Sequence, residues 1–247
     1  MWKTSSLLFA LSFAVEPLSD LALERCLTLE GATPHVQGIA VDGATLYVSA
    51  VDREAAKGWL FEYDLSSGKR LRAVEIQQGA RYHPGGFDID DESLWIPVAE
   101  YRRESTTIIQ RRSRQTLELI SSFEVKDHIG CLAWTGSRLI GGNWDARKIY
   151  EWSPDGRELS VRANPRPTRY QELKHRYGAL IGSGLTGRGR GAIEWLDPET
   201  LSPLRIIVTG TTDKNVPYTQ EGFDHRDGRI YLLPEDSPSR LFIFRAS

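Results

Sequence analysis

The 247-residue sequence has few cysteines, little net charge and no long hydrophobic run. Two cysteines are too few for the disulfide framework that stabilises many small secreted domains. A formal net charge of −2 provides no positive field that would hold nucleic acid or an anionic membrane. No segment is apolar over the roughly 20 residues that a membrane-spanning helix needs. The sequence therefore predicts no nucleic-acid partner and no stable membrane insertion, and it leaves a protein partner open.

The sequence motifs of several common enzyme classes are also absent. Ser49, Ser183 and Ser237 lack the context of a nucleophile elbow, so a serine-hydrolase triad has no support. The glycine-rich residues 187–191 lie between two predicted strands and not in front of a helix, which argues against a phosphate loop or a dinucleotide fingerprint. No pattern of residues identifies a reaction, and the sequence is more informative about the fold.

The N-terminus carries a short apolar run. One positive charge, Lys3, precedes about nine apolar residues, a short version of the pattern of a secretory signal. Residues 12–14, Ser-Phe-Ala, resemble a cleavage site with small residues at its first and third positions. We therefore predict a signal peptide over residues 1–15 and a periplasmic or secreted protein. The alternative is a buried N-terminal strand.

A short stretch of sequence recurs five times along the chain. Its first copy, residues 35–43, reads His-Val-Gln-Gly-Ile-Ala-Val-Asp-Gly. The five copies begin at His35, His83, His128, Arg169 and Thr219. A repeat of roughly 40–50 residues built from short strands is typical of a propeller or a solenoid. Turn-forming residues divide each repeat into four predicted strands, which in the first repeat are residues 36–42, 45–50, 59–64 and 71–76.

The fifth repeat ends without a fourth strand, and the other end of the chain supplies a candidate for it. Residues 23–30 resemble the fourth strands that precede His83 and His128. If this segment completes the last blade, the ring closes and only short strand edges remain. We therefore predict an all-β fold with one domain over residues 22–247. It is a five-bladed β-propeller of four-stranded antiparallel blades, closed by the N-terminal strand.

The two cysteines are predicted to lie far apart in this fold. Cys26 falls on an outer strand and Cys131 on an innermost strand. In an exported protein they could pair, but the predicted separation favours two buried free thiols.

One face of the predicted propeller gathers unusual residues. It is formed by the connections between blades and by the loops that follow each second strand. Binding residues tend to lie on such loops over a rigid frame, and a mixture of aromatic and polar groups suits a small polar molecule. The predicted ligand-binding residues on this face are His35, Gln37, His83, Tyr101, Arg102, His128, Asn143, Trp144, Gln171 and Glu235.

Three of these residues suggest a metal. Neutral imidazole binds zinc and other transition metals, so His35, His83 and His128 are predicted as ligands of a divalent metal of unknown identity. The alternative is structural: each ring forms a hydrogen bond with a neighbouring blade.

Three carboxyl groups are candidates for a catalytic base, since burial at a channel mouth can raise the pKa of a carboxyl group. They are Glu221, Glu172 and Glu100. Ion pairs between blades are the alternative role for acidic residues at these positions.

Parts of the repeat resemble five-bladed propellers of the glutamine cyclotransferase type. Gln37 and Gly38 match the Gln-Gly of that family's opening motif, and residues 170–174 resemble its Asn-Glu-Leu-Glu stretch in the fourth blade. Residues 83–86 depart from it, because His-Pro-Gly-Gly stands where the family has an acidic Gly-Glu-Gly. The sugar-lactonase-like calcium propellers are similar more distantly and usually have six blades.

The whole chain more closely resembles a family of exported bacterial propellers of unknown function. The segments that carry this resemblance are residues 83–86, 99–103, 142–145 and 234–236. The leading hypothesis is an exported propeller that binds a small polar molecule on the face described above. The alternative is a metal- or carboxylate-dependent enzyme, either glutamine cyclotransferase-like or a lactonase-like hydrolase. A scaffold for protein partners is a third hypothesis.

Overall fold

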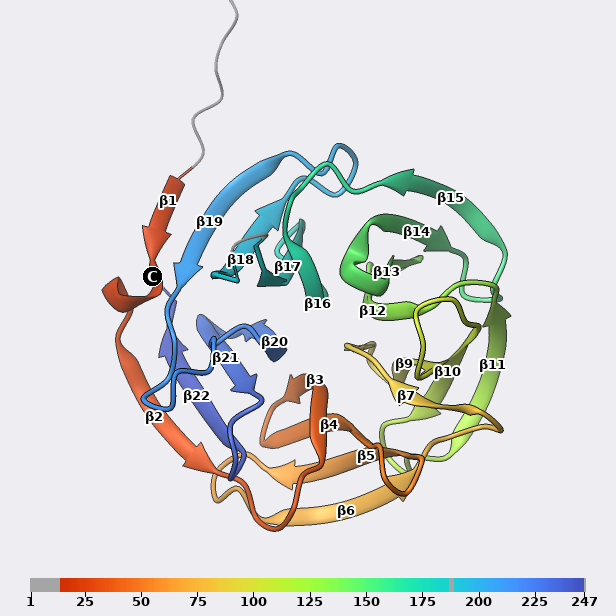
Figure 1. Cartoon of the computed structure of the whole chain (residues 1–247), viewed down its shortest axis with the longest axis horizontal. Helices are drawn as coiled ribbons and strands as arrows, with labels where there is room; N and C mark the ends of the chain where they lie inside the picture. The colour runs from red at the N-terminus through yellow and green to blue at the C-terminus, as the bar shows by residue number, and fades with distance from the viewer. Residues whose placement is uncertain (1–13, 187–188, 247) are drawn as a thin grey trace, which may run out of the picture.

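The computed structural model describes residues 14–186 and 189–246, and these form a ring of five β-sheets (Figure 1). Each sheet is one blade, and the five blades surround a common axis, which confirms the predicted five-bladed β-propeller. The predicted signal peptide, residues 1–15, lies almost entirely outside the described residues and stays a prediction. No helix among the described residues is long and apolar enough to cross a membrane.

Each blade is an antiparallel meander that runs outward from the axis. Blade 1 consists of β3 (His35–Asp42), β4 (Thr45–Asp52), β5 (Lys57–Asp64) and β6 (Arg70–Glu75). Blade 2 consists of β7 (Arg81–Pro84), β8 (Asp88–Ile89), β9 (Ser93–Glu100), β10 (Thr107–Ser113) and β11 (Leu119–Val125). Blade 3 consists of β12 (Ile129–Trp134), β13 (Leu139–Asn143), β14 (Lys148–Trp152) and β15 (Glu158–Ala163).

The last two blades include strands from the N-terminal part of the chain. Blade 4 consists of β16 (Arg169–Arg176), β17 (Ala179–Leu185), β18 (Gly191–Leu196) and β19 (Pro203–Thr209). Blade 5 consists of β20 (Glu221–Arg226), β21 (Arg229–Pro234), β22 (Arg240–Arg245) and β2 (Leu23–Thr28). Strand β2 pairs antiparallel with β22, which confirms that the N-terminal strand closes the ring.

A further N-terminal segment packs on blade 4. Strand β1 (Ala14–Pro17) pairs in parallel with β19, and the short 3₁₀ helix η1 (Leu18–Asp20) follows it. Leu18 and Leu21 are buried against Phe244 in a cluster shared by blades 4 and 5. The outer edge of blade 4 is therefore covered by a strand that the repeat pattern did not predict.

Hydrophobic clusters fill the gaps between neighbouring blades. One cluster, for example, joins Ile39 and Val41 of blade 1 to Leu233 and Leu241 of blade 5. Comparable clusters join each of the other neighbouring pairs around the ring. The apolar side chains of each strand thus hold the blades together face to face, and the connecting loops are left to form the two faces of the disc.

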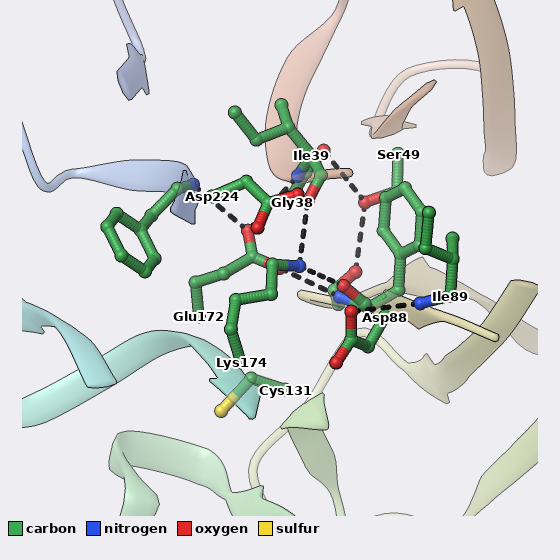
Figure 2. Close-up of polar contacts among 12 residues, drawn as sticks. Gly38, Ile39, Ser49, Asp88, Ile89, Cys131, Glu172, Lys174 and Asp224 are labelled. Atoms are coloured by element: carbon green, nitrogen blue, oxygen red, sulfur yellow. Dashed lines mark hydrogen bonds and ion pairs between the residues drawn. The ribbon is translucent and has the colours of Figure 1, made fainter. Parts of the chain in front are cut away.

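The axis of the ring is filled by a buried ion pair, which we call the central hub (Figure 2). The side chains of Glu172 and Lys174 are fully buried, and Lys174 Nζ lies 2.9 Å from Glu172 Oε1. Glu172 also accepts hydrogen bonds from the backbone N–H groups of Ile39 (3.1 Å), Phe87 (2.9 Å) and Phe223 (3.2 Å). Lys174 donates to the carbonyl oxygens of Ile39 and Phe87. One pair of side chains from blade 4 thereby ties blades 1, 2 and 5 together.

The innermost strands approach too closely at the hub for ordinary side chains. A Cβ atom added to Gly38 would lie 2.7 Å from the Cα atom of Gly86, which is closer than real Cβ atoms come. Glycine at these two positions lets the backbones of blades 1 and 2 meet beside the Glu172 carboxylate.

The cysteines are both free, but only one of them is buried. Cys131 is fully buried on the innermost strand β12, as predicted, and burial raises the pKa of its thiol to about 12. The prediction for Cys26 is wrong, because this residue is exposed. It lies on β2, the outermost strand of its blade, where no further strand covers it.

Candidate functional site

A cavity of about 200 Å³ opens where the innermost strands begin and the second strands end. We call it the mouth cavity. Its walls are formed by His35, Gln37, Arg53, His83, Tyr101, His128, Gly130, Asn143, Trp144, Asp145, Tyr170, Gln171 and Glu221. All five blades contribute to it, on the face that the sequence predicted.

Small irregularities of the innermost strands turn some of these residues into the cavity. The pairing of β3 with β4 shifts between Val36 and Gly38, which leaves Gln37 as an extra, bulged residue. The same kind of shift leaves Gly130 of β12 and Gln171 of β16 as bulged residues. All three line the mouth cavity, so the bulges supply a ring of positions that regular strands would not present there.

His83 is held in the neutral form at the centre of the wall. Its Nε2 lies 2.7 Å from Gln37 Oε1, and because an amide oxygen only accepts, Nε2 is the donor. Its ring packs 4.2 Å from the ring of Tyr101 and 5.2 Å from that of His128. Burial lowers the pKa of His83 well below its usual value, and the nearby His128 and His35 add to this. The remaining nitrogen, Nδ1, is buried and has no hydrogen-bond partner among the described residues.

His128 is also neutral and is oriented by the backbone. Its Nδ1 lies 2.9 Å from the carbonyl oxygen of Arg102, so Nδ1 carries the proton and Nε2 is left as an acceptor. Trp144 packs edge-on at 4.5 Å. Burial lowers the pKa of His128 to about 4. His83 and His128 therefore act as uncharged hydrogen-bonding groups near neutral pH.

His35 differs from the other two histidines because it has an acidic partner. Its Nδ1 lies 2.7 Å from Glu235 Oε1. Hydrogen bonding to His35 lowers the pKa of the Glu235 carboxyl. Gln220 Nε2 donates to Glu235 Oε2 at 3.2 Å and steadies this carboxylate from the other side.

Glu221 is a buried acidic residue of the mouth cavity. It is 6% exposed, and no residue that the structure describes donates a hydrogen bond to its carboxyl group. Burial raises the pKa of Glu221 well above its usual value, and the neighbouring Glu235 and Glu172 add to this. Its backbone φ of 98° is in a region that L-residues rarely adopt. Such strain costs about 1–3 kcal/mol and clusters at functional sites.

Aromatic side chains and one arginine complete the walls. The Arg53 guanidinium lies 4.6 Å from the centre of the Tyr101 ring. The Tyr82 ring stacks on Tyr101 with the two ring centres 6.1 Å apart. Trp144 is flanked by Arg103 at 5.3 Å. The cavity thus offers flat apolar surfaces beside neutral and acidic hydrogen-bonding groups.

Four predicted residues do not line the mouth cavity, namely Glu172, Glu100, Arg102 and Glu235. Glu172 belongs to the central hub, where four donors occupy its carboxylate. Glu100 accepts hydrogen bonds from Thr106 and forms an ion pair with the exposed Arg102 at 2.7 Å. Asn143 lines the cavity, but its amide is engaged by Asp127 and by the N–H of Lys148. Arg53 is a wall residue that the predicted set lacks, although it follows the second strand of its repeat as Tyr101 does.

The geometry favours a different group of potential metal ligands from the predicted three histidines. Among the described residues, one group of three or more His, Cys, Asp or Glu has its ligand atoms within 4.8 Å of one another, and it consists of His35, Glu221 and Glu235. His83 and His128 are not part of this group.

Fold and site together define a five-bladed β-propeller with a polar, aromatic-walled cavity at one end of a blocked axis. Residues 26–164 match the model of a family of unknown function, DUF6454. Since this is more than half of the chain, the protein belongs to that family. No curated protein matches the sequence.

Solved structures with a similar fold include two propellers. The glutaminyl cyclase of Myxococcus xanthus has a TM-score of 0.71 and 14% identity, and the match covers 95% of this chain and 98% of that one. The WD40 domain of Neurospora crassa Pan2 has a TM-score of 0.51 and 14% identity, and the match covers 81% of this chain and 56% of that one. At such low identity these similarities show the fold alone.

Proposed function

We propose that this protein binds a small polar molecule in the mouth cavity. The observation that carries the proposal is the unsatisfied Glu221 carboxyl group, buried at the cavity wall beside aromatic rings. Buried polar groups are nearly always hydrogen-bonded, so a carboxyl group to which no described residue donates is suited to a partner such as a bound ligand. A cavity of about 200 Å³ is smaller than the roughly 300–1,000 Å³ that encloses drug-sized ligands, which points to a molecule the size of an amino acid or a monosaccharide.

The walls indicate which groups such a ligand carries. A hydrogen-bond donor on the ligand satisfies Glu221, and a second donor is met by His128 Nε2. Tyr101 and Trp144 offer flat surfaces to a compact carbon frame. The apolar run at the N-terminus supports a periplasmic or secreted location, where small solutes of this kind are encountered.

A carboxylate- or metal-dependent enzyme, cyclotransferase-like or lactonase-like, is the second candidate. The observation that favours it is the strained backbone of Glu221, because positive φ at a non-glycine residue is a frequent feature of catalytic positions. The fold similarity to a glutaminyl cyclase is consistent with this candidate. The absence of an acid at residues 83–86 weighs against the cyclotransferase form.

The test combines a search for a retained ligand with a binding screen. Native mass spectrometry of the purified protein looks for a bound small molecule, and calorimetric titration then measures the affinity of that molecule or of amino acids, sugars and lactones. Glu221→Gln and Trp144→Ala should weaken binding at least tenfold, whereas Glu100→Gln, outside the cavity, should not. Conversion of the bound molecule, followed by mass spectrometry, would select the enzyme. Binding that is unchanged in both cavity variants would overturn the proposal.

A further inference from the structure

We propose that His35, Glu221 and Glu235 form a binding site for one divalent transition-metal ion at the edge of the mouth cavity. One imidazole nitrogen and two carboxylate oxygens can be drawn from these side chains, all within 4.8 Å of one another. Ligands around a metal are typically separated by about 3–4 Å, because each lies about 2.0–2.2 Å from the ion. Small rotations of three side chains are therefore enough to enclose an ion.

The buried Glu221 carboxyl group is the main support for this site. It is 6% exposed and receives no hydrogen bond from the described part of the chain, and the carboxylate of Glu235 is close by. Arg53 of the cavity wall is stacked on Tyr101 and forms no ion pair with Glu221, although its charge opposes the rise in the pKa of Glu221. A divalent cation would add positive charge beside the two neighbouring carboxylates, of which only Glu235 has a hydrogen bond from His35 among the described residues.

The surroundings also resemble the outer shell of a metal site. Ligating carboxylates are usually held by further hydrogen bonds that fix their direction. Glu235 has this support, because its carboxylate accepts from Gln220 Nε2 and its N–H donates to the Gln220 carbonyl oxygen at 3.0 Å. Glu221 is fixed in another way, since it is the first residue of β20 and has a constrained backbone with positive φ.

The composition of the site selects the class of metal. A set of one histidine and two carboxylates suits Zn²⁺ and its transition-metal neighbours better than Ca²⁺ or Mg²⁺, which prefer oxygen ligands alone. Three protein ligands on one side would leave positions open toward the cavity for water or for a bound molecule. The site shares Glu221 with the small-molecule ligand proposed above, but Zn²⁺ binding is measured without that ligand, so each proposal can be tested by itself.

The experiment measures metal binding by tag-free protein, dialysed against chelator and carrying Cys26→Ser, since that exposed thiol could bind zinc by itself. Zn²⁺ is titrated by calorimetry and counted by native mass spectrometry. We expect one ion per chain, a higher melting temperature with Zn²⁺, and absorption bands of a histidine-ligated site when Co²⁺ is used instead.

Variants assign the ion to this site. Glu221→Gln and His35→Gln should each lower the affinity for Zn²⁺ at least 100-fold and abolish the rise in melting temperature. Glu100→Gln and His225→Gln, the same changes outside the mouth cavity, should leave both unchanged. Folded, metal-free protein that binds no Zn²⁺, or a Glu221→Gln variant that binds it as tightly as the parent, overturns the metal site. If the small molecule still binds in that case, the proposed function stands alone.

Discussion

Two glutamates on innermost strands of neighbouring blades have opposite surroundings. Glu172 in the central hub receives three backbone N–H groups and the Lys174 ammonium, whereas Glu221 in the mouth cavity receives no hydrogen bond from the described residues. Burial raises the pKa of both, to about 7 for Glu172, where Lys174 and the N–H groups oppose it. For Glu221 the rise is large, because the nearby carboxylates add to it. A satisfied carboxylate holds the ring together, and an unsatisfied one is left for a molecule or ion from outside.

Replacing Glu172 in the central hub should have the largest effect on stability. Glu172→Leu should lower the free energy of unfolding by about 3–5 kcal/mol, because it leaves a buried ammonium and three N–H groups without their acceptor. Urea denaturation followed by tryptophan fluorescence measures this. Glu172→Gln, which keeps one oxygen acceptor, should lose less. A Leu variant within about 1 kcal/mol of the parent would show that the hub does not hold the blades together.

The stability of the folded protein should fall in acid, because histidines of the mouth cavity are held in the neutral form. The pKa of His128 is lowered to about 4, so the unfolded chain takes up a proton between pH 6.5 and 4 and the folded chain does not. Stability should therefore fall as the pH drops through this window, by about 3 kcal/mol at pH 4 for His128. Asp127 and the Arg102 carbonyl oppose the lowering, whereas burial and Arg103 cause it.

Glu172 in the hub and His128 in the mouth cavity should respond to pH in opposite directions. Because the pKa of Glu172 is raised, its contribution to stability is greatest at low pH and is lost as the pH rises toward 7. Denaturation measured between pH 4 and 7 can separate the contribution of Glu172 from that of His128. His128→Gln should flatten the loss of stability in acid. An unchanged acid slope in this variant would mean that other groups, such as His225 with its pKa of about 4, dominate.

Glu221→Gln should have a small effect on stability and a large one on binding. The change removes no hydrogen bond within the described residues and relieves repulsion from Glu235, so the free energy of unfolding should change by less than about 1 kcal/mol. Retention of the small molecule should be lost. Chemical denaturation and calorimetry on the same sample check the two parts. A loss of stability as large as that of Glu172→Leu would show that Glu221, like Glu172, stabilises the fold.

Glu100→Gln should have the smallest effect on binding, because Glu100 lies outside the mouth cavity. Its carboxylate is engaged by Thr106 and Arg102, and Glu100 does not line the cavity. Ligand affinity and Zn²⁺ affinity should both match those of the parent protein. A tenfold change in either affinity would require the site to extend along the loop that follows β9.

The sequence predicted the ring because the repeat and the missing last strand are both visible as patterns of residues. It also predicted which face would hold His35, His83 and Glu221, since aligned positions in a propeller lie at the same height. The pattern failed at Glu172, whereas Gln171 lines the mouth cavity as predicted. A bulge in β16 turns Gln171 to the mouth cavity and Glu172 to the hub, and an irregularity of one residue reverses the direction of side chains without a clear mark in the sequence. Cys26 was mistaken for a similar reason, since strand order alone does not show which outer positions remain uncovered.

The central hub also limits how a ligand can reach the mouth cavity. Lys174, Glu172 and the touching backbones of Gly38 and Gly86 block the axis with protein atoms. The mouth cavity is therefore a dead end, and the hollow on the opposite face, beside Arg114 and Arg176, has no passage to it. A molecule that occupies the cavity must therefore enter and leave on the face where the innermost strands begin. Ligand and solvent therefore exchange on the same face, and a bound molecule must leave by the side from which it entered.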